Sequence, residues 1–150
     1  MKVLGLDLGN RTIGMAISDY LEIIANPIGT FRFEEKDLES AFNYVQNTVK
    51  ENDVKKIVLG LPKNMDGTIG FQAEYCLEFK KILEERLSLE VIMVDERLTT
   101  KMADSVMLKA DISRNKRKKN VDKLAATIIL QSYLDRKNRK DIKKWKTKNN

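Results

Sequence analysis

Residues 3–19, VLGLDLGNRTIGMAISD, restrict the fold of this chain more than any other segment. They contain two apolar strand patterns separated by a turn at Gly9 and Asn10, residue types that tolerate a positive φ. Strands joined by so short a connection pair as an antiparallel hairpin, because a parallel pair needs a long crossover. Asp7 interrupts the first strand, where burying an unpaired carboxylate costs several kcal/mol. We expect a hydrogen bond, a cation or a metal ion to offset that cost.

After this hairpin the sequence changes from strand patterns to alternating helix and strand patterns. We expect a third antiparallel strand at 22–33 and later strands at 56–62 and 90–98. Helices are expected at 38–49 (capped by Asp37), at 71–87 (with Phe71 on its apolar face), from Thr99 or Thr100 to about Ala110, and after a cap at Asn120. The later strands should join the sheet in parallel through crossovers. The order therefore predicts an α/β fold with a mixed five-stranded sheet, three antiparallel strands followed by parallel ones, flanked by helices.

Composition narrows the class of protein. The 150 residues are expected to form a single domain over 1–135 followed by a flexible basic tail over 136–150. The single cysteine, Cys76, excludes an internal disulfide and fits a reducing compartment. The longest apolar run, LAATIIL at 124–130, is too short to span a membrane. We therefore expect a soluble cytoplasmic protein.

The chain contains no histidine, which excludes several catalytic arrangements. A Ser-His-Asp triad, a Cys-His dyad, a His-ligated zinc site and a histidine general base are all ruled out. Any hydrolytic chemistry must therefore depend on carboxylates, lysines, hydroxyl groups or a metal ion.

Positive charge is concentrated near the end of the chain. Residues 1–113 carry 14 Lys and Arg against 19 Asp and Glu, whereas residues 114–150 carry 14 against 3. The basic part has two pieces, RNKRKK at 114–119 and RKNRKDIKKWKTK at 136–148. A basic segment on a mildly acidic body indicates a polyanionic partner. A solvated, lysine-rich tail that maintains solubility explains the second piece equally well.

Three carboxylates occupy positions where local rules favour other residues. Asp7 lies in a buried strand, Glu96 ends the last strand, and Asp122 lies in the first turn of the last helix. In such a sheet, functional groups gather at strand ends and nearby helix termini. Three converging carboxylates would form an oxygen-only site for Mg²⁺ or Mn²⁺, able to deprotonate water and stabilise phosphoryl charge. As alternatives, Asp122 is favourable beside a helix N-terminus by itself, and Glu96 can form a structural ion pair with Arg97 or Arg11.

Four ordered motifs resemble the YqgF/RuvX family of the RNase H-like superfamily. They are GLDLGNRTIGMAISD, IVLGLPKNMDGTIG, VDERLTT and NVDKLAATIILQSYL, and together they cover residues 3–135. The resemblance implies an RNase H-like fold and a metal-dependent nuclease whose acidic site falls on Asp7, Glu96 and Asp122. Many nucleases of the superfamily carry a second carboxylate on the fourth strand. Here that strand ends in Gly60-Leu61-Pro62, so Glu96 must reach across it.

These observations predict a divalent-metal-dependent endonuclease that hydrolyses phosphodiesters in structured nucleic acid. Members of the family are described as Holliday junction resolvases or as nucleases that process the 5′ end of pre-16S ribosomal RNA. On the family alone, ribosomal RNA precursor is the first substrate and a DNA four-way junction the second. Ribosomal particles are further expected partners, and the protein is expected to be a monomer or weak homodimer. The residues expected to contact nucleic acid are Arg11, Arg97, Arg114, Lys116, Arg117, Lys118 and Lys119.

Two other classes of function fit parts of the sequence. The segment DLGNRTIG also resembles the phosphate loop of actin-like and sugar-kinase ATPases. Those folds need two such domains and a second phosphate motif, for which 150 residues are too few. The other alternative is a non-catalytic RNA-binding factor in ribosome assembly, in which the acidic residues persist for folding.

The basic segment 114–119 should bind the phosphate backbone. Replacing Lys116, Arg117, Lys118 and Lys119 with Ser should weaken nucleic-acid binding and flatten its dependence on log[salt] by roughly one unit of slope per lost contact. Titration of a labelled nucleic acid at several salt concentrations measures both effects. Unchanged affinity and slope would assign this segment to a solvated face.

Overall fold

The computed structural model describes residues 1–63, 66–96 and 114–149 of the chain. At 114–123, 145, 148 and 149 it describes the backbone alone. Arg97 and the short helix expected up to about Ala110 lie outside the described residues.

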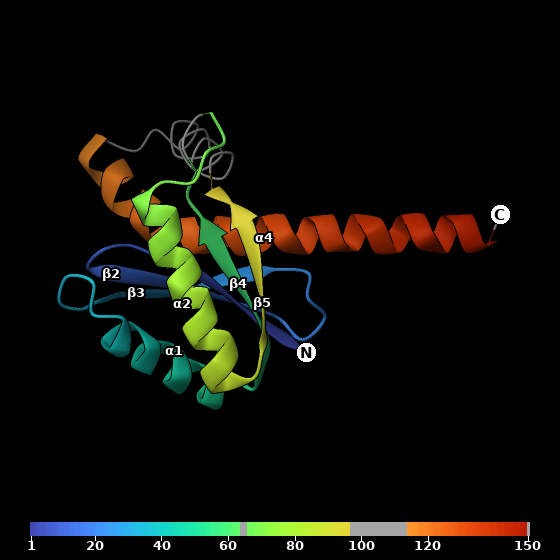
Figure 1. Cartoon of the computed structure of the whole chain (residues 1–150). Coiled ribbons are helices and arrows are strands. Elements are labelled where there is room, and N and C mark those ends of the chain that lie inside the picture. The colour runs from blue at the N-terminus through green and yellow to red at the C-terminus, as the bar shows by residue number, and fades with distance from the viewer. Residues whose placement is uncertain (64–65, 97–113, 150) are drawn as a thin grey trace.

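A mixed five-stranded sheet forms the centre of the molecule, with strand order β3-β2-β1-β4-β5 (Figure 1). The strands are β1 (Lys2–Leu8), β2 (Thr12–Ser18), β3 (Ala25–Arg32), β4 (Val54–Leu61) and β5 (Glu90–Asp95). The first three pair antiparallel, whereas β4 and β5 join in parallel. The predicted sheet, including the change from antiparallel to parallel pairing, is confirmed.

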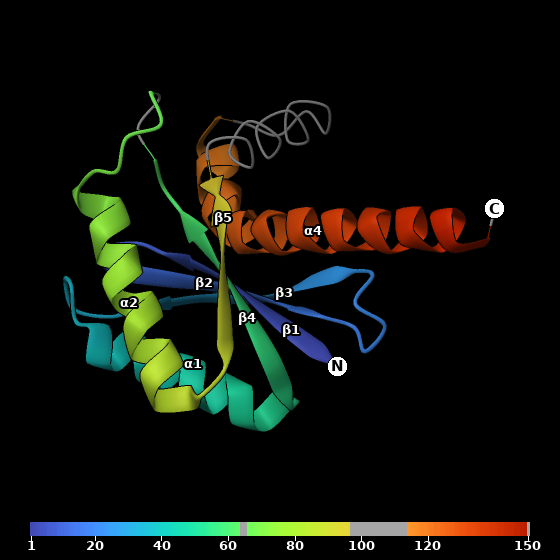
Figure 2. The same cartoon turned by 45° about the vertical axis from the view of Figure 1, so that its right-hand side comes forward.

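Helices cover both faces of the sheet (Figures 1 and 2). They are α1 (Leu38–Asn52), α2 (Phe71–Leu87) and α4 (Arg114–Asn149). Because side chains alternate along a strand, Leu4, Leu6 and Leu8 of β1 pack in the core beneath α1 and α2. Val3 of the same strand points to the opposite face and packs in a second core with α4. None of the helices in the described ranges is long and apolar enough to cross a membrane.

The first two helices begin where the sequence predicts. The Asp37 side chain caps α1 by accepting hydrogen bonds from the Ser40 backbone N–H at 3.3 Å and from the Ser40 hydroxyl at 2.8 Å. Helix α2 has the predicted bounds, but its first residue differs from expectation. Phe71 is 92% exposed, so its predicted place on the apolar face is wrong. Phe71 lies in the first turn of α2, and helical spacing alone does not ensure that another element packs over a residue there.

Helix α4 begins earlier than predicted. It starts at Arg114 instead of after Asn120, so the basic segment 114–119, expected to be a loop, is helical. No glycine or proline occurs between residues 114 and 149, and Lys and Arg are good helix formers. The same helix continues through residues 136–149, which the sequence assigns to a tail. The predicted flexibility of that segment stays a prediction.

Helix α4 packs very closely on β1. A Cβ atom at Gly5 would lie 2.6 Å from Leu130 Cβ and 3.0 Å from the Ala126 carbonyl oxygen, so only glycine fits there. Further along the helix, the Tyr133 hydroxyl accepts a hydrogen bond from Lys56 Nζ at 3.2 Å, and Lys56 pairs with the start of β1. The helix therefore runs antiparallel to β1, with its earlier residues toward the carboxyl end of that strand.

Residues 139–149, called the arm below, project past the body of the protein (Figures 1 and 2). The last contacts with the body are made by Lys137 and Asn138, which both bind Glu22. Beyond them, the hydrogen bonds in the described part of the chain stay within the helix, from Arg139 Nε to the Asp135 carbonyl and from Thr147 Oγ1 to the Lys143 carbonyl. The arm therefore buries little surface against the body.

Deleting residues 139–150 should leave the melting temperature nearly unchanged. None of the described side chains of the arm lies in the core, and Lys137 and Asn138 are retained. Thermal unfolding followed by circular dichroism measures this. A fall of many degrees would show that the arm docks on the body.

Candidate active site

Asp7 and Glu96 lie on the same face of the sheet, the one covered by α4. Asp7 alternates in β1 with Val3 and Gly5, which both face that helix. Glu96 follows the end of β5 directly, two residues after Val94, which packs in the core under α4. Both carboxylates are half-buried. Two strands that are not neighbours in the sheet therefore present their acids to one place.

Gly60 occupies the strand between them and makes their contact possible. It lies in β4, paired with Val94 of β5. A Cβ atom at Gly60 would overlap Glu96 Oε1, and it would lie 2.8 Å from Glu96 Cγ and 2.6 Å from Ile129 Cδ1. The missing side chain leaves the space through which Glu96 crosses β4. Gly60 is not among the site residues expected from the sequence, although a lone glycine within a strand is a signal of close approach.

The side chain of Glu96 is hydrogen-bonded to Asp7. The pKa of Glu96 is raised to about 9, first because burial disfavours its charged form, then because of the hydrogen bond with Asp7 and repulsion from Asp7 and Asp95. Without a cation, the two side chains share a proton at neutral pH. This contact also offsets the cost of placing Asp7 in an apolar strand.

Cys76 is excluded as a nucleophile. Burial, with smaller contributions from the charges of Glu96 and Asp7, raises the pKa of its thiol to about 12. The thiolate is the reactive form of cysteine, and it is scarce at neutral pH in such surroundings.

The donor set fits a hard divalent cation. It consists of carboxylate oxygens alone, which suit Mg²⁺ or Mn²⁺, and a cation would replace the proton that the pair shares. Within the described ranges, no group of three or more His, Cys, Asp or Glu residues is arranged so that it could hold a metal ion. The side chain of the third predicted ligand, Asp122, is outside those ranges. Its backbone lies in α4 one turn before Ala126, in the direction of the carboxyl end of β1.

The structure describes only some of the basic residues that are expected to contact nucleic acid. Arg11 is exposed, and its guanidinium lies 3.5 Å from Glu35, so the structural ion pair between Arg11 and Glu96 is not formed. Residues 114–119 form the first turns of α4, ahead of Asp122, without described side chains. Arg97 lies outside the described residues. Their roles in binding nucleic acid stay predictions.

A cavity of about 350 Å³ lies beside the β1–β2 turn. Asn10, Lys36 and the first residues of α2 line it, and Gln72 Nε2 donates to the Leu8 carbonyl at 3.3 Å. Phe71 exposes its ring at this cavity. The carboxylates of Glu74 and Glu78 also line this cavity, so its lining does not indicate a phosphate-binding site.

Comparison with known proteins gives consistent matches over most of the chain. A sequence model of the RuvX family, described as Holliday junction resolvase, matches residues 1–136. A protein of Bacillus cereus (strain AH187) is 48% identical over 137 residues, which cover 91% of this chain and 100% of that protein. A protein of Bacillus thuringiensis (strain Al Hakam) is 47% identical over the same shares. Both are named "Putative pre-16S rRNA nuclease".

Solved structures resemble the fold. Thermus thermophilus RuvC in complex with a Holliday junction substrate has a TM-score of 0.54 at 11% identity, covering 91% of this chain and 95% of that one. The fowlpox virus Holliday junction resolvase has a TM-score of 0.54 at 15% identity, covering 90% and 99%. These likenesses confirm the predicted RNase H-like fold.

The shared proton makes stability depend on pH. Because the pKa of Glu96 is raised from 4.5 to about 9, the folded protein holds more protons than the unfolded chain between these values. The metal-free protein should therefore lose stability as the pH rises through this window. In EDTA, the melting temperature of the Glu96→Gln variant should depend less on pH over the same range than that of the parent. Glu51→Gln, at an exposed position of α1, should follow the parent. Parallel curves for the parent and Glu96→Gln would contradict the shared proton.

Proposed function

Because this chain belongs to the RuvX family of nucleases, we propose that it is a divalent-metal-dependent endonuclease acting on structured nucleic acid. The observation that carries the proposal is the contact of Asp7 with Glu96 across Gly60. It brings two carboxylates together at the ends of strands, where such a sheet places its functional groups. A structural role would not require two acids to approach each other in a half-buried place.

Asp7, Glu96 and Asp122 would hold Mg²⁺ or Mn²⁺. When bound, the cation supplies an activated water and stabilises the charge that develops on the phosphoryl group. Asp7 and Glu96 orient this site from β1 and β5, and Glu96 gives up its proton as the site is filled. The packed surface of α4 at Ile129 keeps bulk water from one side of the pair.

Basic residues around the site would hold the substrate by its phosphates. The set comprises Arg11, Arg97, Arg114, Lys116, Arg117, Lys118 and Lys119. The segment 114–119 directly precedes Asp122 in α4, so a phosphate bound there lies near the carboxylates.

The proposed substrate is the precursor of 16S ribosomal RNA, cleaved at its 5′ end. This choice is supported by the names of the two relatives, which match 91% of this chain. Ribosomal particles would then be partners and the cytoplasm the location, with the protein acting as a monomer or weak homodimer. The description of the family model favours a second substrate, the DNA four-way junction, with the same chemistry. Parallel assays with labelled precursor RNA and a labelled junction distinguish the two.

Asp7→Asn separates a metal site from a structural one. The change removes the carboxylate with which Glu96 shares a proton and keeps the shape, so Glu96 no longer faces the charge of Asp7 and the metal-free variant should be as stable as the parent or more stable. Nuclease activity should fall to background. Mg²⁺ or Mn²⁺ should raise the melting temperature of the parent, because a ligand that binds only the folded state stabilises it. The variant should lose most of that gain.

Asp53→Asn is the matched control. Asp53 is exposed and has a left-handed backbone that asparagine also adopts, so this variant should behave as the parent. If Asp7 instead neutralises a buried cation, Asp7→Asn should cost about 3–5 kcal/mol and metal should have no effect. That outcome would refute the nuclease site. If the variant is stable and binds nucleic acid fully, and the parent itself cleaves no substrate, the non-catalytic RNA-binding factor is favoured.

A further inference from the structure

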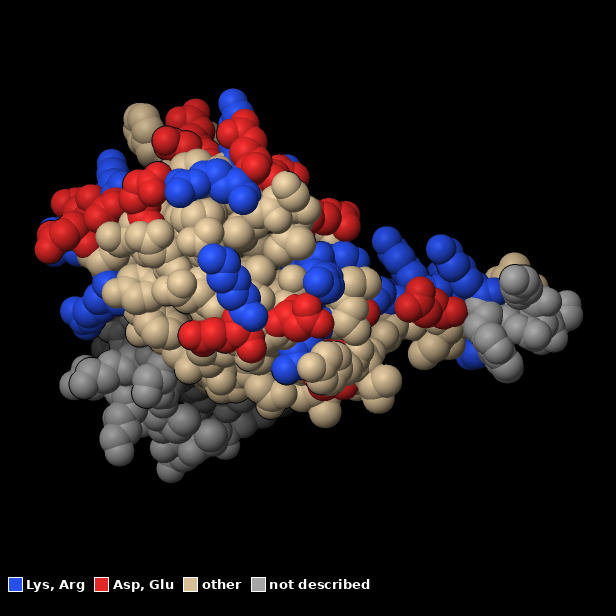
Figure 3. All heavy atoms as spheres, turned by 90° about the horizontal axis from the view of Figure 1, so that it is seen from below, with Lys and Arg blue, Asp and Glu red and all other residues tan. Residues whose placement is uncertain are grey.

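The net positive charge of this chain lies beyond the part that the family model matches. Residues 137–150 carry seven Lys or Arg and one Asp, a net of +6 that equals the charge of the whole chain. The preceding 136 residues carry 21 basic and 21 acidic side chains. Figure 3 shows both signs mixed over the visible face of the body and mostly Lys and Arg on the projecting helix. The body alone has no overall charge with which to attract a polyanion.

Contacts at the start of the arm set the direction in which it leaves the body. Lys137 Nζ lies 2.8 Å from Glu22 Oε1, and Asn138 Nδ2 donates to the Glu22 carbonyl at 3.2 Å. About two turns earlier, the Gln131 side chain accepts from the Ala25 backbone N–H at 2.8 Å and donates to the Ile23 carbonyl at 2.9 Å. The Gln131 side chain thus binds the loop before β3 and the first residue of that strand, and its Nε2 also donates to Asp135 Oδ1 at 3.0 Å. The arm is a directed continuation of α4.

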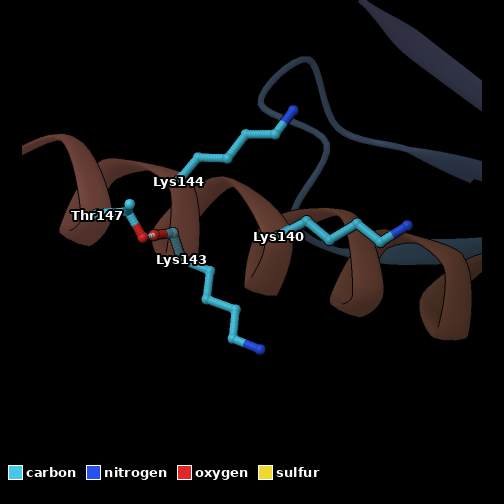
Figure 4. A pocket seen from close by; sticks show the side chains of 4 residues that line it. All are labelled: Lys140, Lys143, Lys144 and Thr147. Atoms are coloured by element: carbon cyan, nitrogen blue, oxygen red, sulfur yellow. Dashed lines mark hydrogen bonds between the residues drawn. The ribbon is translucent and has the colours of Figure 1, made fainter.

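Three lysines of the arm have no ion-pair partner among the residues that the structure describes. Lys140, Lys143 and Lys144 lie one turn apart or next to each other, and all three are exposed. The side chains of Lys143 and Lys144 extend away from the helix, whereas that of Lys140 runs along it (Figure 4). None of these three forms an ion pair with a residue that the structure describes. Like charges three or four residues apart destabilise a helix. A polyanion lying along the arm would remove this repulsion and release its own counterions.

We propose that the arm binds the phosphate backbone of double-helical nucleic acid, at a distance from the bond that the active site cleaves. This rests on the proposed nuclease function, and it assigns a second contact with the same substrate. From Asp122 to Lys144 the helix rises about 33 Å, at 1.5 Å per residue. That length corresponds to roughly 10 base pairs at 3.4 Å each. A duplex that extends at least this far from the cleaved bond can reach both places, and a shorter one cannot.

The first test measures binding without metal, so that it does not depend on cleavage. The triple variant Lys140→Gln, Lys143→Gln, Lys144→Gln keeps good helix formers and removes three charges. Its affinity for duplexes of about 24 base pairs, RNA and DNA in parallel, should fall, and the slope of log K against log[salt] should flatten by roughly two to three units. The control triple Lys50→Gln, Lys55→Gln, Lys81→Gln removes three exposed charges from the body and should bind nearly as the parent.

The second test uses cleavage and separates the arm from the active site. The triple variant should raise KM for substrates with a long duplex beside the cleaved bond, without changing kcat. For substrates with a short duplex, KM should match that of the parent. The deletion of residues 139–150 should reproduce both results if the arm acts as a unit.

Three outcomes would overturn the proposal. If the triple variant binds the duplexes as tightly as the parent at every salt concentration, the arm does not bind their backbone, and another partner, such as an acidic protein surface, is indicated. An equal loss in the control triple would assign the effect to net charge alone. A KM rise that is independent of duplex length would exclude a distant contact. Because binding is measured without metal, a failure of the nuclease proposal would leave the binding result standing.

Discussion

The close packing of α4 on the sheet is the constraint on which the rest of this structure depends. Two glycines allow it: Gly5, where a Cβ would meet Leu130 and Ala126, and Gly60, where a Cβ would meet Ile129 and Glu96. Because interiors are close-packed, neither position has room for one more carbon. At one end of this contact, the backbone of Asp122 lies in the part of α4 nearer the carboxyl end of β1. At the other end, the same helix leaves the body as the arm. One packing arrangement therefore sets the proposed active site and the proposed distant contact together.

Repulsion between like charges occurs at both functional regions. Burial, then the hydrogen bond with Asp7 and repulsion from Asp7 and Asp95, raise the pKa of Glu96 to about 9. On the arm, Lys140, Lys143 and Lys144 have no ion-pair partner among the described residues. Each arrangement is unfavourable in the isolated protein and becomes favourable with a ligand of opposite charge, a cation in the first case and a polyanion in the second. Departures from stable local design of this kind are expected at functional sites.

Local chemistry explains which expectations from sequence were confirmed and which were wrong. The cap at Asp37 and the bounds of α2 follow from short-range patterns, and the structure has both. The segment 114–119 was expected to be a loop because it lacks apolar periodicity. Helix formation there needs only good helix formers and the absence of glycine and proline. Phe71 has the spacing of a core residue but lies at a helix start, where it is 92% exposed.

The sequence by itself determined the order of elements, the mixed sheet and the identity of the acids that break local rules. Those properties depend on residues close together in the chain, through turn chemistry, strand alternation and the cost of burying Asp7. Only the tertiary structure decided that Glu96 reaches Asp7, because their contact depends on the register of β1, β4 and β5 and on the space at Gly60. It also decided that the basic end of the chain continues α4 in one direction, since that direction is set by contacts of Gln131, Lys137 and Asn138 with the distant loop before β3. Contacts between segments so far apart in the chain arise from packing, which no local pattern encodes.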